Sequence, residues 1–200
     1  MIHKTAIVDN KAKVSNSANI GPYSVIGPNV EIGENVIIHS HVNISGNTKI
    51  RNGNKILWCG NGGSAAQAQH LSTELVGGLR DHDRPAIPSI SLTTDSSFLT
   101  AWSNDTDFNS VFSRQISALG QKGDVLIGIT TSGNSDNVIK AVDIAEEMGI
   151  HTIVFTGKDG GKINGKADIT ITIPSDDTQR IQEGHILCGH ILCELVEQSL

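Results

Sequence analysis

The chain has 200 residues, of which 38% are hydrophobic and 18% charged, a composition typical of a folded protein with one or two domains. Its formal net charge is -6 and it has no basic run, which argues against a nucleic-acid-binding surface. It shows neither a membrane-spanning stretch nor a signal-peptide core, and its three cysteines lack metal-type spacing, so we expect a cytoplasmic protein with reduced thiols.

The first part of the chain carries a six-residue repeat. An aliphatic residue stands at every sixth position from Ile2 to Ile56, and a small or β-branched residue follows four positions after each of the first eight. A period of six fits neither an α-helix nor a hairpin meander, but it fits a parallel β-helix with stacked aliphatic side chains. We therefore expect a short β-helix over residues 1–54, which predicts a fold and not a function.

The string IGPYSVIGPNVEIGENVIIHSHVNISGNTKI resembles the first coils of the hexapeptide-repeat acyltransferases, above all the family that acylates UDP-N-acetylglucosamine. The resemblance covers about residues 1–56 and implies a left-handed β-helix of roughly three coils. In that family the catalytic histidine and the acyl-donor contacts lie in later coils. We interpret His39 and His41 as surface or stacked polar residues, and we assign no acyl transfer to this segment.

From Lys55 onward, short apolar runs alternate with stretches of helical spacing. This alternation predicts a doubly wound parallel α/β domain over residues 55–200, with a five-stranded sheet flanked by helices. The predicted strands are residues 55–59, 87–92, 124–129, 151–156 and 167–173, and the predicted helices are 64–76, 108–119, 135–148 and 178–199.

The junction of the two parts is abrupt. Ile56 fits both the six-residue repeat and the first predicted strand of the α/β domain. No linker rich in Pro or Ser separates the two patterns. We therefore infer a fusion at a locally shared sequence, RNGNKIL.

Two loops rich in glycine and hydroxyl residues follow the first and third predicted strands of the α/β domain. They are CGNGGS at residues 59–64 and TTSGNS at residues 130–135, and each precedes a predicted helix. A strand, a turn of small residues and a helix N-terminus together present free backbone N–H groups and a positive dipole end to an anion. The hydroxyls of the second loop favour a phosphate at the carboxyl edge of a parallel sheet. Ser135 could instead be a simple helix N-cap, but capping does not explain four hydroxyl residues around one glycine.

Four polar side chains on two predicted helices could surround one substrate or one divalent metal. His70 and Glu74 are about 40° apart on the helix after the first loop, so they share one face. Gln182 and His190 are about 80° apart on the last helix and also share one side. Spacing alone favours the plainer interpretation, in which His70 and Glu74 make a solvated contact.

These residue types permit an aldose–ketose isomerisation. Such a reaction removes a proton beside a carbonyl, stabilises an enediolate and returns the proton to the neighbouring carbon. It needs a carboxylate or similar base, a proton donor at oxygen, and a phosphate anchor that fixes the reacting carbons.

Residues 53–199 resemble phosphosugar-binding SIS domains, and most closely the phosphoheptose (sedoheptulose 7-phosphate) isomerases. The strings that carry the resemblance are CGNGGSAAQAQHLSTEL, LTTDSSFLTAWSNDTDFNSVFSRQ, GDVLIGITTSGNSDNVIKA, TGKDGGK and RIQEGHILCGHILCELVE. The resemblance implies conversion of sedoheptulose 7-phosphate to D-glycero-D-manno-heptose 7-phosphate, a step in the synthesis of lipopolysaccharide precursors.

The same resemblance implies roles for individual residues. Glu74 and His190 would be the acid–base pair. One zinc ion per subunit would be bound by His70, Glu74, Gln182 and His190. The binding site of the sugar phosphate would be lined by Asn61, Gly62, Gly63, Ser64, Glu74, Asn104, Asp105, Thr130, Thr131, Ser132, Ser135 and Gln182.

Two other functions stay open at this point. The chain could be a non-catalytic SIS relative, like the replication-initiator-associating proteins that do not keep the acid–base pair, or an inactive fusion product. Phosphoheptose isomerases form tetramers with the help of an N-terminal helical segment, whereas hexapeptide β-helices usually form trimers. Because β-helix coils replace that segment here, we expect a homo-oligomer, tetrameric by resemblance, whose symmetry the sequence leaves open.

Overall fold

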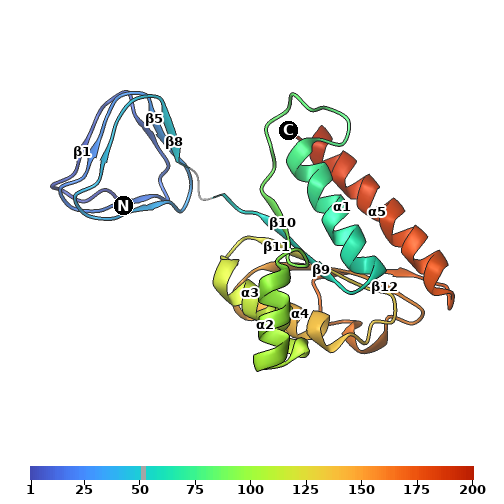
Figure 1. The fold of residues 1–200 in the computed structure, drawn as a ribbon. Coiled ribbons are helices and arrows are strands. Elements are labelled where there is room, and N and C mark those ends of the chain that lie inside the picture. The colour runs from blue at the N-terminus through green and yellow to red at the C-terminus, as the bar shows by residue number, and fades with distance from the viewer. Residues whose placement is uncertain (51–52) are drawn as a thin grey trace. The chain divides into compact units, whose positions relative to one another are not determined.

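The computed structural model describes residues 1–50 and 53–200, which form two compact units, Met1–Gly53 and Asn54–Leu200 (Figure 1). The predicted junction RNGNKIL includes residues 51 and 52, which lie outside the described residues. None of the helices in the described ranges is long and apolar enough to cross a bilayer.

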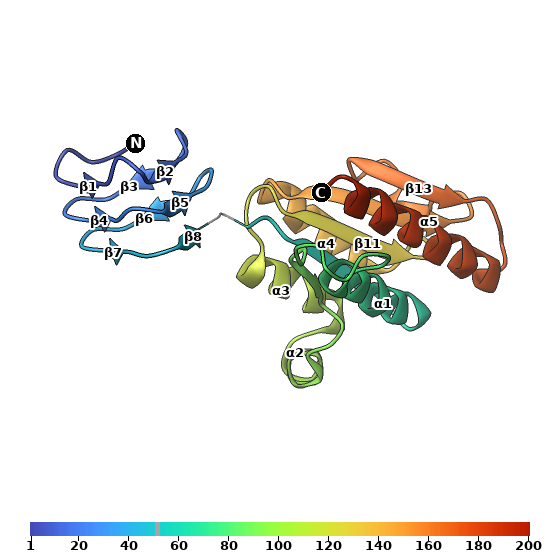
Figure 2. The same ribbon diagram turned by 90° about the horizontal axis from the view of Figure 1, so that it is seen from above.

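The N-terminal unit consists of short strands in three parallel stacks (Figure 2). The stacks are β1–β4–β7, β2–β5–β8 and β3–β6, and partner residues such as Ile7 and Val25 are 18 positions apart. The strands are β1 (Ile7–Val8), β2 (Lys13–Val14), β3 (Asn19–Ile20), β4 (Val25–Ile26), β5 (Val30–Ile32), β6 (Ile37–Ile38), β7 (Asn43–Ile44) and β8 (Thr48–Ile50).

The six-residue repeat accounts for the interior and the corners of this unit. Its buried core is made of the repeat residues Ala18, Ile20, Ile26, Val30, Ile32, Val36 and Ile38. Four corner residues six positions apart, Tyr23, Asn29, Asn35 and His41, have a positive φ between 56° and 63°, a region that asparagine adopts more readily than most residues. His39 and His41 are exposed, and the His41 ring stacks on Tyr23 at 5.2 Å. The left-handed β-helix itself stays a prediction.

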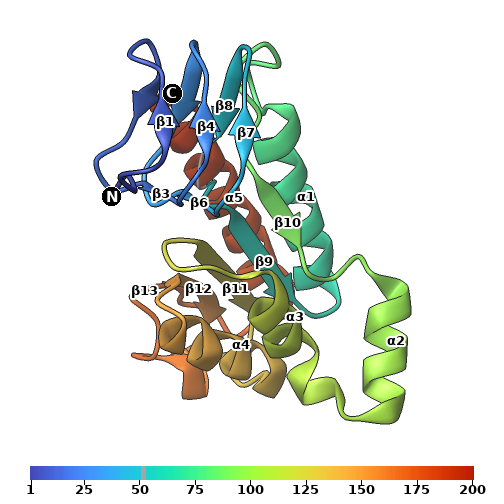
Figure 3. The same cartoon turned by 90° about the vertical axis from the view of Figure 1, so that its left-hand side faces the viewer.

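The second unit is a parallel five-stranded sheet with helices on both faces (Figure 3), which confirms the predicted α/β fold. The strand order is β10–β9–β11–β12–β13. The strands are β9 (Ile56–Gly60), β10 (Ser89–Ser91), β11 (Val125–Thr130), β12 (His151–Gly157) and β13 (Ile169–Ile173). The helices are α1 (Gly63–Gly77), α2 (Ser96–Asp105), α3 (Val111–Leu119), α4 (Asp136–Glu147) and α5 (Thr178–Gln198), with short 3-10 turns at Phe108–Ser110 and Gly161–Ile163.

Each face of this sheet has its own apolar core. Helices α1 and α5 cover one face, where Trp58, Leu71 and Phe155 are buried together. Helices α3 and α4 cover the other, where Leu57 and Phe112 are buried. Helix α2 was not predicted, because it buries no residue fully and only Phe98, Leu99 and Trp102 pack against the core.

The residue shared by the two sequence patterns belongs to the α/β sheet. Ile56 pairs with Ser89 of β10 and with Val125 of β11. Just before it, Lys55 donates to the fully buried Asp124 carboxylate from its backbone N–H at 2.9 Å and from Nζ at 2.7 Å. Because breaking a buried ion pair leaves an unpaired charge, this contact fixes the start of β9. Among the described residues, β6 consequently has β3 as its only strand partner.

Candidate active site

The two glycine-rich loops lie side by side at the carboxyl edge of the sheet, because β9 and β11 are neighbouring parallel strands. In the second loop, the Thr130 and Ser135 hydroxyls are 3.1 Å apart. Ser135 occupies the N-cap position of α4, yet its side chain makes no capping hydrogen bond. Gly133 has a φ of 66°, and a Cβ there would lie 1.9 Å from the Gly160 carbonyl oxygen. The loop is therefore held by its glycine and by the neighbouring loop, and the paired Thr130 and Ser135 hydroxyls lie at the α4 N-terminus, where an anion is favoured.

A reciprocal amide pair joins the two loops. Asn61 Nδ2 donates to Asn137 Oδ1 at 2.8 Å, and Asn137 Nδ2 donates back to Asn61 Oδ1 at 2.9 Å. Asn61 belongs to the first loop, whereas Asn137 is almost fully buried in the first turn of α4. We did not predict a role for Asn137, because its partner is 76 residues away and no local pattern marks the pair.

Gln182 lies against the first loop. A Cβ at Gly63 would be 2.4 Å from Gln182 Nε2, so a larger residue there would displace this amide. The Gln182 carbonyl oxygen accepts a hydrogen bond of 2.6 Å from Gln67 Nε2 on α1. Gln182 and the start of α1 are thus packed together near the carboxyl edge of the sheet.

His70, Glu74 and His190 converge on one point between α1 and α5. Their ligand atoms all lie within 4.8 Å of one another. His70 Nε2 is 2.8 Å from His190 Nε2 and 3.3 Å from Glu74 Oε1. Two imidazole nitrogens and one carboxylate oxygen are typical ligands of zinc, so this group fits a divalent metal. Gln182 lies about 12 Å before His190 along α5, and its contacts given above are with α1.

Close helix packing produces this convergence. Gly189 precedes His190, and a Cβ at Gly189 would lie only 2.3 Å from Leu71 Cδ1. Leu71 follows His70 and is fully buried. Because the two helices touch at Gly189 and Leu71, the two histidines beside this contact reach hydrogen-bonding distance.

The candidate site is elongated. Glu74 is eleven residues after Gly63, which places its Cα about 16 Å along α1 from the first loop. Helical side chains tilt toward the helix N-terminus, so the Glu74 carboxylate points back toward His70 and the loops. A bound molecule that contacts both ends must extend along the seam between α1 and α5.

Asn104 and Asp105 lie elsewhere in this unit. They end α2, which projects from the sheet (Figure 3), and both are exposed. Asn104 Nδ2 donates to Asp105 Oδ1 at 2.8 Å. Within residues 1–50 and 53–200, neither side chain makes a hydrogen bond or an ion pair with the glycine-rich loops.

Three buried groups near the site are unsuited to its chemistry. The His185 ring pairs through Nε2 with the Thr156 carbonyl oxygen at 2.9 Å, and burial lowers the pKa of this histidine, which favours its neutral form. Burial raises the pKa of the Cys59 and Cys193 thiols to about 12, so neither is a thiolate at neutral pH.

Comparison with known proteins places this geometry in a family. The family model of the SIS domain matches residues 44–157. The phosphoheptose isomerase of Aliarcobacter butzleri is 54% identical over 151 residues, which are 76% of this chain and 79% of that protein. The one of Aquifex aeolicus is 56% identical over 151 residues, which are 76% of this chain and 78% of that protein. The chain belongs to the phosphoheptose isomerases of the SIS-domain family.

Solved structures agree with this assignment. The phosphoheptose isomerase of Neisseria gonorrhoeae has a TM-score of 0.67 at 48% identity, over 74% of this chain and 78% of that one. The one of Francisella tularensis has a TM-score of 0.69 at 40% identity, with the same two coverages. The protein is therefore an isomerase, and its Asn54–Leu200 unit has the SIS fold.

The N-terminal unit of this isomerase matches a second family model. The bacterial transferase hexapeptide model, with six repeats, covers residues 11–46. The SIS model begins at residue 44, inside this stretch, although Asn43–Ile44 forms a strand of the N-terminal unit. The two models thus overlap over residues 44–46, which belong to the Met1–Gly53 unit, where Ile44 pairs with Ile26.

Substituting Gly189 tests the packing that unites the two histidines. In Gly189→Ala the new methyl group would overlap buried Leu71, which we expect to cost about 1–3 kcal/mol of stability and to separate α1 from α5. Zn²⁺ affinity, measured by competition with a chromogenic chelator, should fall. The double variant Gly189→Ala/Leu71→Ala makes room again and should bind Zn²⁺ more tightly than the single variant. Unchanged affinity in Gly189→Ala would contradict the packing argument.

Removing one amide tests the link between the two loops. In Asn137→Ala the Asn61 amide loses its partner, which we expect to cost about 1–3 kcal/mol of unfolding free energy and to weaken binding of inorganic phosphate. Chemical denaturation and phosphate titration measure the two effects. Asn61→Ala/Asn137→Ala should lose less stability than the sum of the single variants. Additive losses would mean that the two amides act independently.

Proposed function

We propose that the chain converts sedoheptulose 7-phosphate to D-glycero-D-manno-heptose 7-phosphate by proton transfer through an enediol. The product would supply heptose for lipopolysaccharide precursors, and we place the reaction in the cytoplasm. The observation that carries the proposal is the convergence of His70, Glu74 and His190 in a chain 54% identical to a phosphoheptose isomerase.

Glu74 would act as the base. Its carboxylate would take a proton from C1 of the ketose and return it to C2, with the enediol between the two transfers. His190 would donate a proton to the C2 carbonyl oxygen and take one from the C1 hydroxyl, so that the carbonyl moves from C2 to C1. The ligand atoms of both residues belong to a group no wider than 4.8 Å, which suits transfers at adjacent atoms.

The phosphate would bind at the second loop. The hydroxyls of Thr130, Thr131, Ser132 and Ser135 would donate to it, and the α4 N-terminus would add backbone amides and its dipole. The phosphate-bearing end and the carbonyl end of an open-chain heptose are opposite ends of the molecule. An extended substrate thus suits a site whose anion cradle and acid–base pair are separated along the α1–α5 seam.

The remaining predicted residues would contact the sugar hydroxyls between these ends. They are Asn61, Gly62, Gly63, Ser64 and Gln182 on the seam, together with Asn104 and Asp105. Because α2 projects from the sheet, we assign Asn104 and Asp105 to the site of a neighbouring subunit in a homo-oligomer.

His70, Glu74 and His190 would hold one zinc ion, with Gln182 as the further predicted ligand. When bound, zinc would supply a positive charge that polarises the substrate carbonyl or holds its ligands in place. His70 and Glu74 share one face of α1, so that helix would orient two of the ligands by itself.

For the N-terminal unit we propose a left-handed parallel β-helix related to the first coils of the UDP-N-acetylglucosamine acyltransferases. The 18-residue pairing distance and the aliphatic core of residues 18–38 support this assignment. The unit would have no acyltransferase activity of its own. In the chain it would take the place of the helical segment of the family. Measuring the mass of the homo-oligomer in solution therefore decides between a trimer and a tetramer.

Glu74→Gln tests the base directly. We expect turnover of sedoheptulose 7-phosphate to fall by about 10²- to 10⁴-fold, because general base catalysis contributes that much, whereas binding of a phosphate ester should survive. Glu183→Gln changes an exposed carboxylate of α5 that pairs with Arg180, and it should keep wild-type turnover. Retained activity in Glu74→Gln would refute the base assignment. A folded wild-type protein without turnover would favour a non-catalytic sugar-phosphate binder.

Metal removal tests the zinc assignment. Purified protein should contain about one zinc per chain by elemental analysis. The His70→Ala variant should contain markedly less, because His70 Nε2 contacts both His190 Nε2 and Glu74 Oε1 in the ligand group. Dialysis against a chelator should lower turnover, and added Zn²⁺ should restore it. Full turnover of metal-free protein would restrict the role of these residues to acid–base chemistry.

A further inference from the structure

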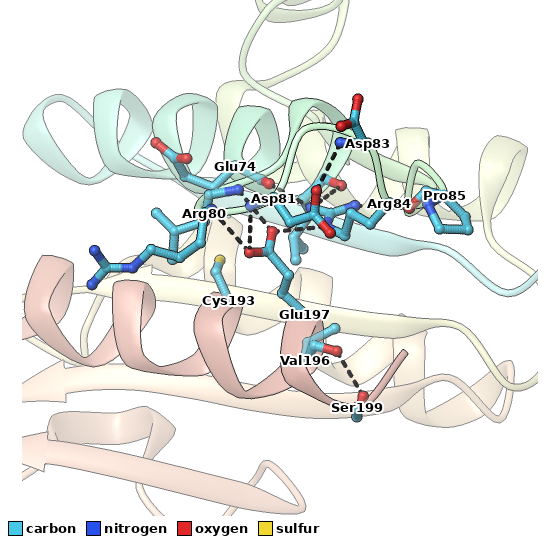
Figure 4. Close-up of polar contacts among 12 residues, drawn as sticks. Glu74, Arg80, Asp81, Asp83, Arg84, Pro85, Cys193, Val196, Glu197 and Ser199 are labelled. Atoms are coloured by element: carbon cyan, nitrogen blue, oxygen red, sulfur yellow. Dashed lines mark hydrogen bonds and ion pairs between the residues drawn. The ribbon is translucent and has the colours of Figure 1, made fainter.

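A buried ion pair joins the C-terminal ends of α1 and α5 (Figure 4). Arg84 Nε donates to Glu197 Oε2 at 2.7 Å, and the two side chains are only 5% and 7% exposed. Glu197 lies in the last turn of α5, and Arg84 follows the loop after α1.

The Glu197 carboxylate is saturated with donors. Besides Arg84, it accepts hydrogen bonds of 2.9, 2.9 and 3.0 Å from the backbone N–H groups of Leu79, Arg80 and Asp81. Arg84 and these amides lower the pKa of Glu197 to about 2, so the carboxylate is charged at neutral pH. Glu197 therefore fastens the loop after α1 to α5, and the more exposed ion pair of Arg80 Nε and Glu194 Oε1 at 3.3 Å joins the same two elements.

The Arg84 guanidinium holds the end of α1 in turn. Its Nη2 donates to the carbonyl oxygens of Glu74 and Leu75, both at 2.9 Å. The Glu74 carbonyl oxygen also accepts from the Gly78 N–H at 3.0 Å, and the Leu75 carbonyl oxygen accepts from the Ile87 N–H at 3.2 Å, so Arg84 adds a second donor to each. One side chain thus contacts the backbone of Glu74 and the carboxylate of Glu197 at the same time.

The positions of these contacts matter for the acid–base pair. Arg84 contacts the carbonyl group of Glu74 itself. Glu197 is seven residues after His190, so the two side chains lie on nearly the same face of α5, about 10 Å apart along its axis. The network therefore connects the backbone that carries the proposed base to the helix that carries the proposed proton donor.

We propose that Arg84 and Glu197 are positioning residues of the isomerase, which hold the last turn of α1 against α5 and so set the distance between the Glu74 carboxylate and the His190 ring. The proposal rests on the proposed function, because it takes Glu74 and His190 as the reacting pair. Neither Arg84 nor Glu197 touches the substrate in this arrangement.

Packing already joins the two helices without this network. Leu71, Leu75 and Cys193 are buried in a common apolar core, and Gly189 sits against Leu71. A buried ion pair is a poor source of stability, because desolvation of the two charges offsets most of their attraction. The fold thus does not require Arg84 and Glu197, and the role that we propose for them is to adjust the position of the last turn of α1.

Paired apolar substitution separates positioning from stability. Arg84→Met/Glu197→Met removes both buried charges together, so the double variant should stay folded even where Arg84→Met alone leaves Glu197 unpaired and unfolds. For the folded double variant we expect kcat to fall by about 10- to 100-fold with KM for sedoheptulose 7-phosphate nearly unchanged, because an error of about 1 Å in a reacting group costs up to about 100-fold. Zn²⁺ affinity should fall as well.

Two further variants complete the experiment. Arg84→Lys can pair with Glu197 but cannot reach both carbonyl oxygens as well, so its kcat should lie between the wild-type and double-variant values. Arg180→Met/Glu183→Gln removes an exposed pair on the same α5 helix and should leave kcat, KM and Zn²⁺ affinity unchanged.

Different results would contradict the positioning role and the proposed isomerase function. Wild-type kcat and Zn²⁺ affinity in a folded double variant would overturn the positioning role, even if Glu74→Gln is inactive. If the wild-type protein has no isomerase activity, the proposed function fails, and Zn²⁺ affinity of the double variant still reports whether the network holds Glu74 in place. A proportional loss of kcat and folded fraction would also contradict positioning.

Discussion

The contact between α1 and α5 is the interaction on which the candidate site depends. Gly189 has no side chain, so Leu71 can occupy the space beside it and the two helix backbones approach closely. The residues next to this contact, His70 and His190, are thereby brought to an Nε2–Nε2 distance of 2.8 Å. Glu74 joins them from the next turn of α1 at 3.3 Å. A group of metal-type ligands thus arises from one tight helix contact on an otherwise apolar face of the sheet.

Polar networks then fix the two ends of the elongated site. At the carboxyl edge of the sheet, the Asn61–Asn137 amide pair holds the two glycine-rich loops together. At the other end, Arg84 and Glu197 bind the last turn of α1 to α5. Both networks are largely buried and use most of their hydrogen-bonding groups, which favours one geometry because unpaired groups there would be costly.

The two units of the chain are built on different sequence periods, and a buried charge decides where one period stops. In the sequence the six-residue repeat continues to Ile56. In the structure, however, Lys55 is bound to the fully buried Asp124 and Ile56 pairs within the α/β sheet. A third strand beside β6 would require Lys55 to abandon this ion pair. The hexapeptide stacking therefore ends with β8 at Ile50 among the described residues.

The sequence by itself determined the architecture of both units and the chemical types of the site. Periods of six and the alternation of apolar runs with helical spacing are local patterns, and they predicted the stacked core around Ile26 and the parallel α/β sheet. The two loops and the His70–Glu74 spacing were visible for the same reason. Helix α2 was not predicted because it buries no side chain completely and its core-facing residues, Phe98, Leu99 and Trp102, span little more than one turn.

Only the tertiary structure decided which distant residues meet. Asn61 and Asn137 are 76 positions apart and Arg84 and Glu197 are 113 apart, so no local period connects them. Helical angle predicted that Gln182 and His190 share a side of α5; both contact α1, and the structure adds that Gln182 lies at its start beside Gly63 and His190 further along beside His70. Partners are chosen by the order of the strands and the close approach of the helices, and these depend on packing of the whole chain.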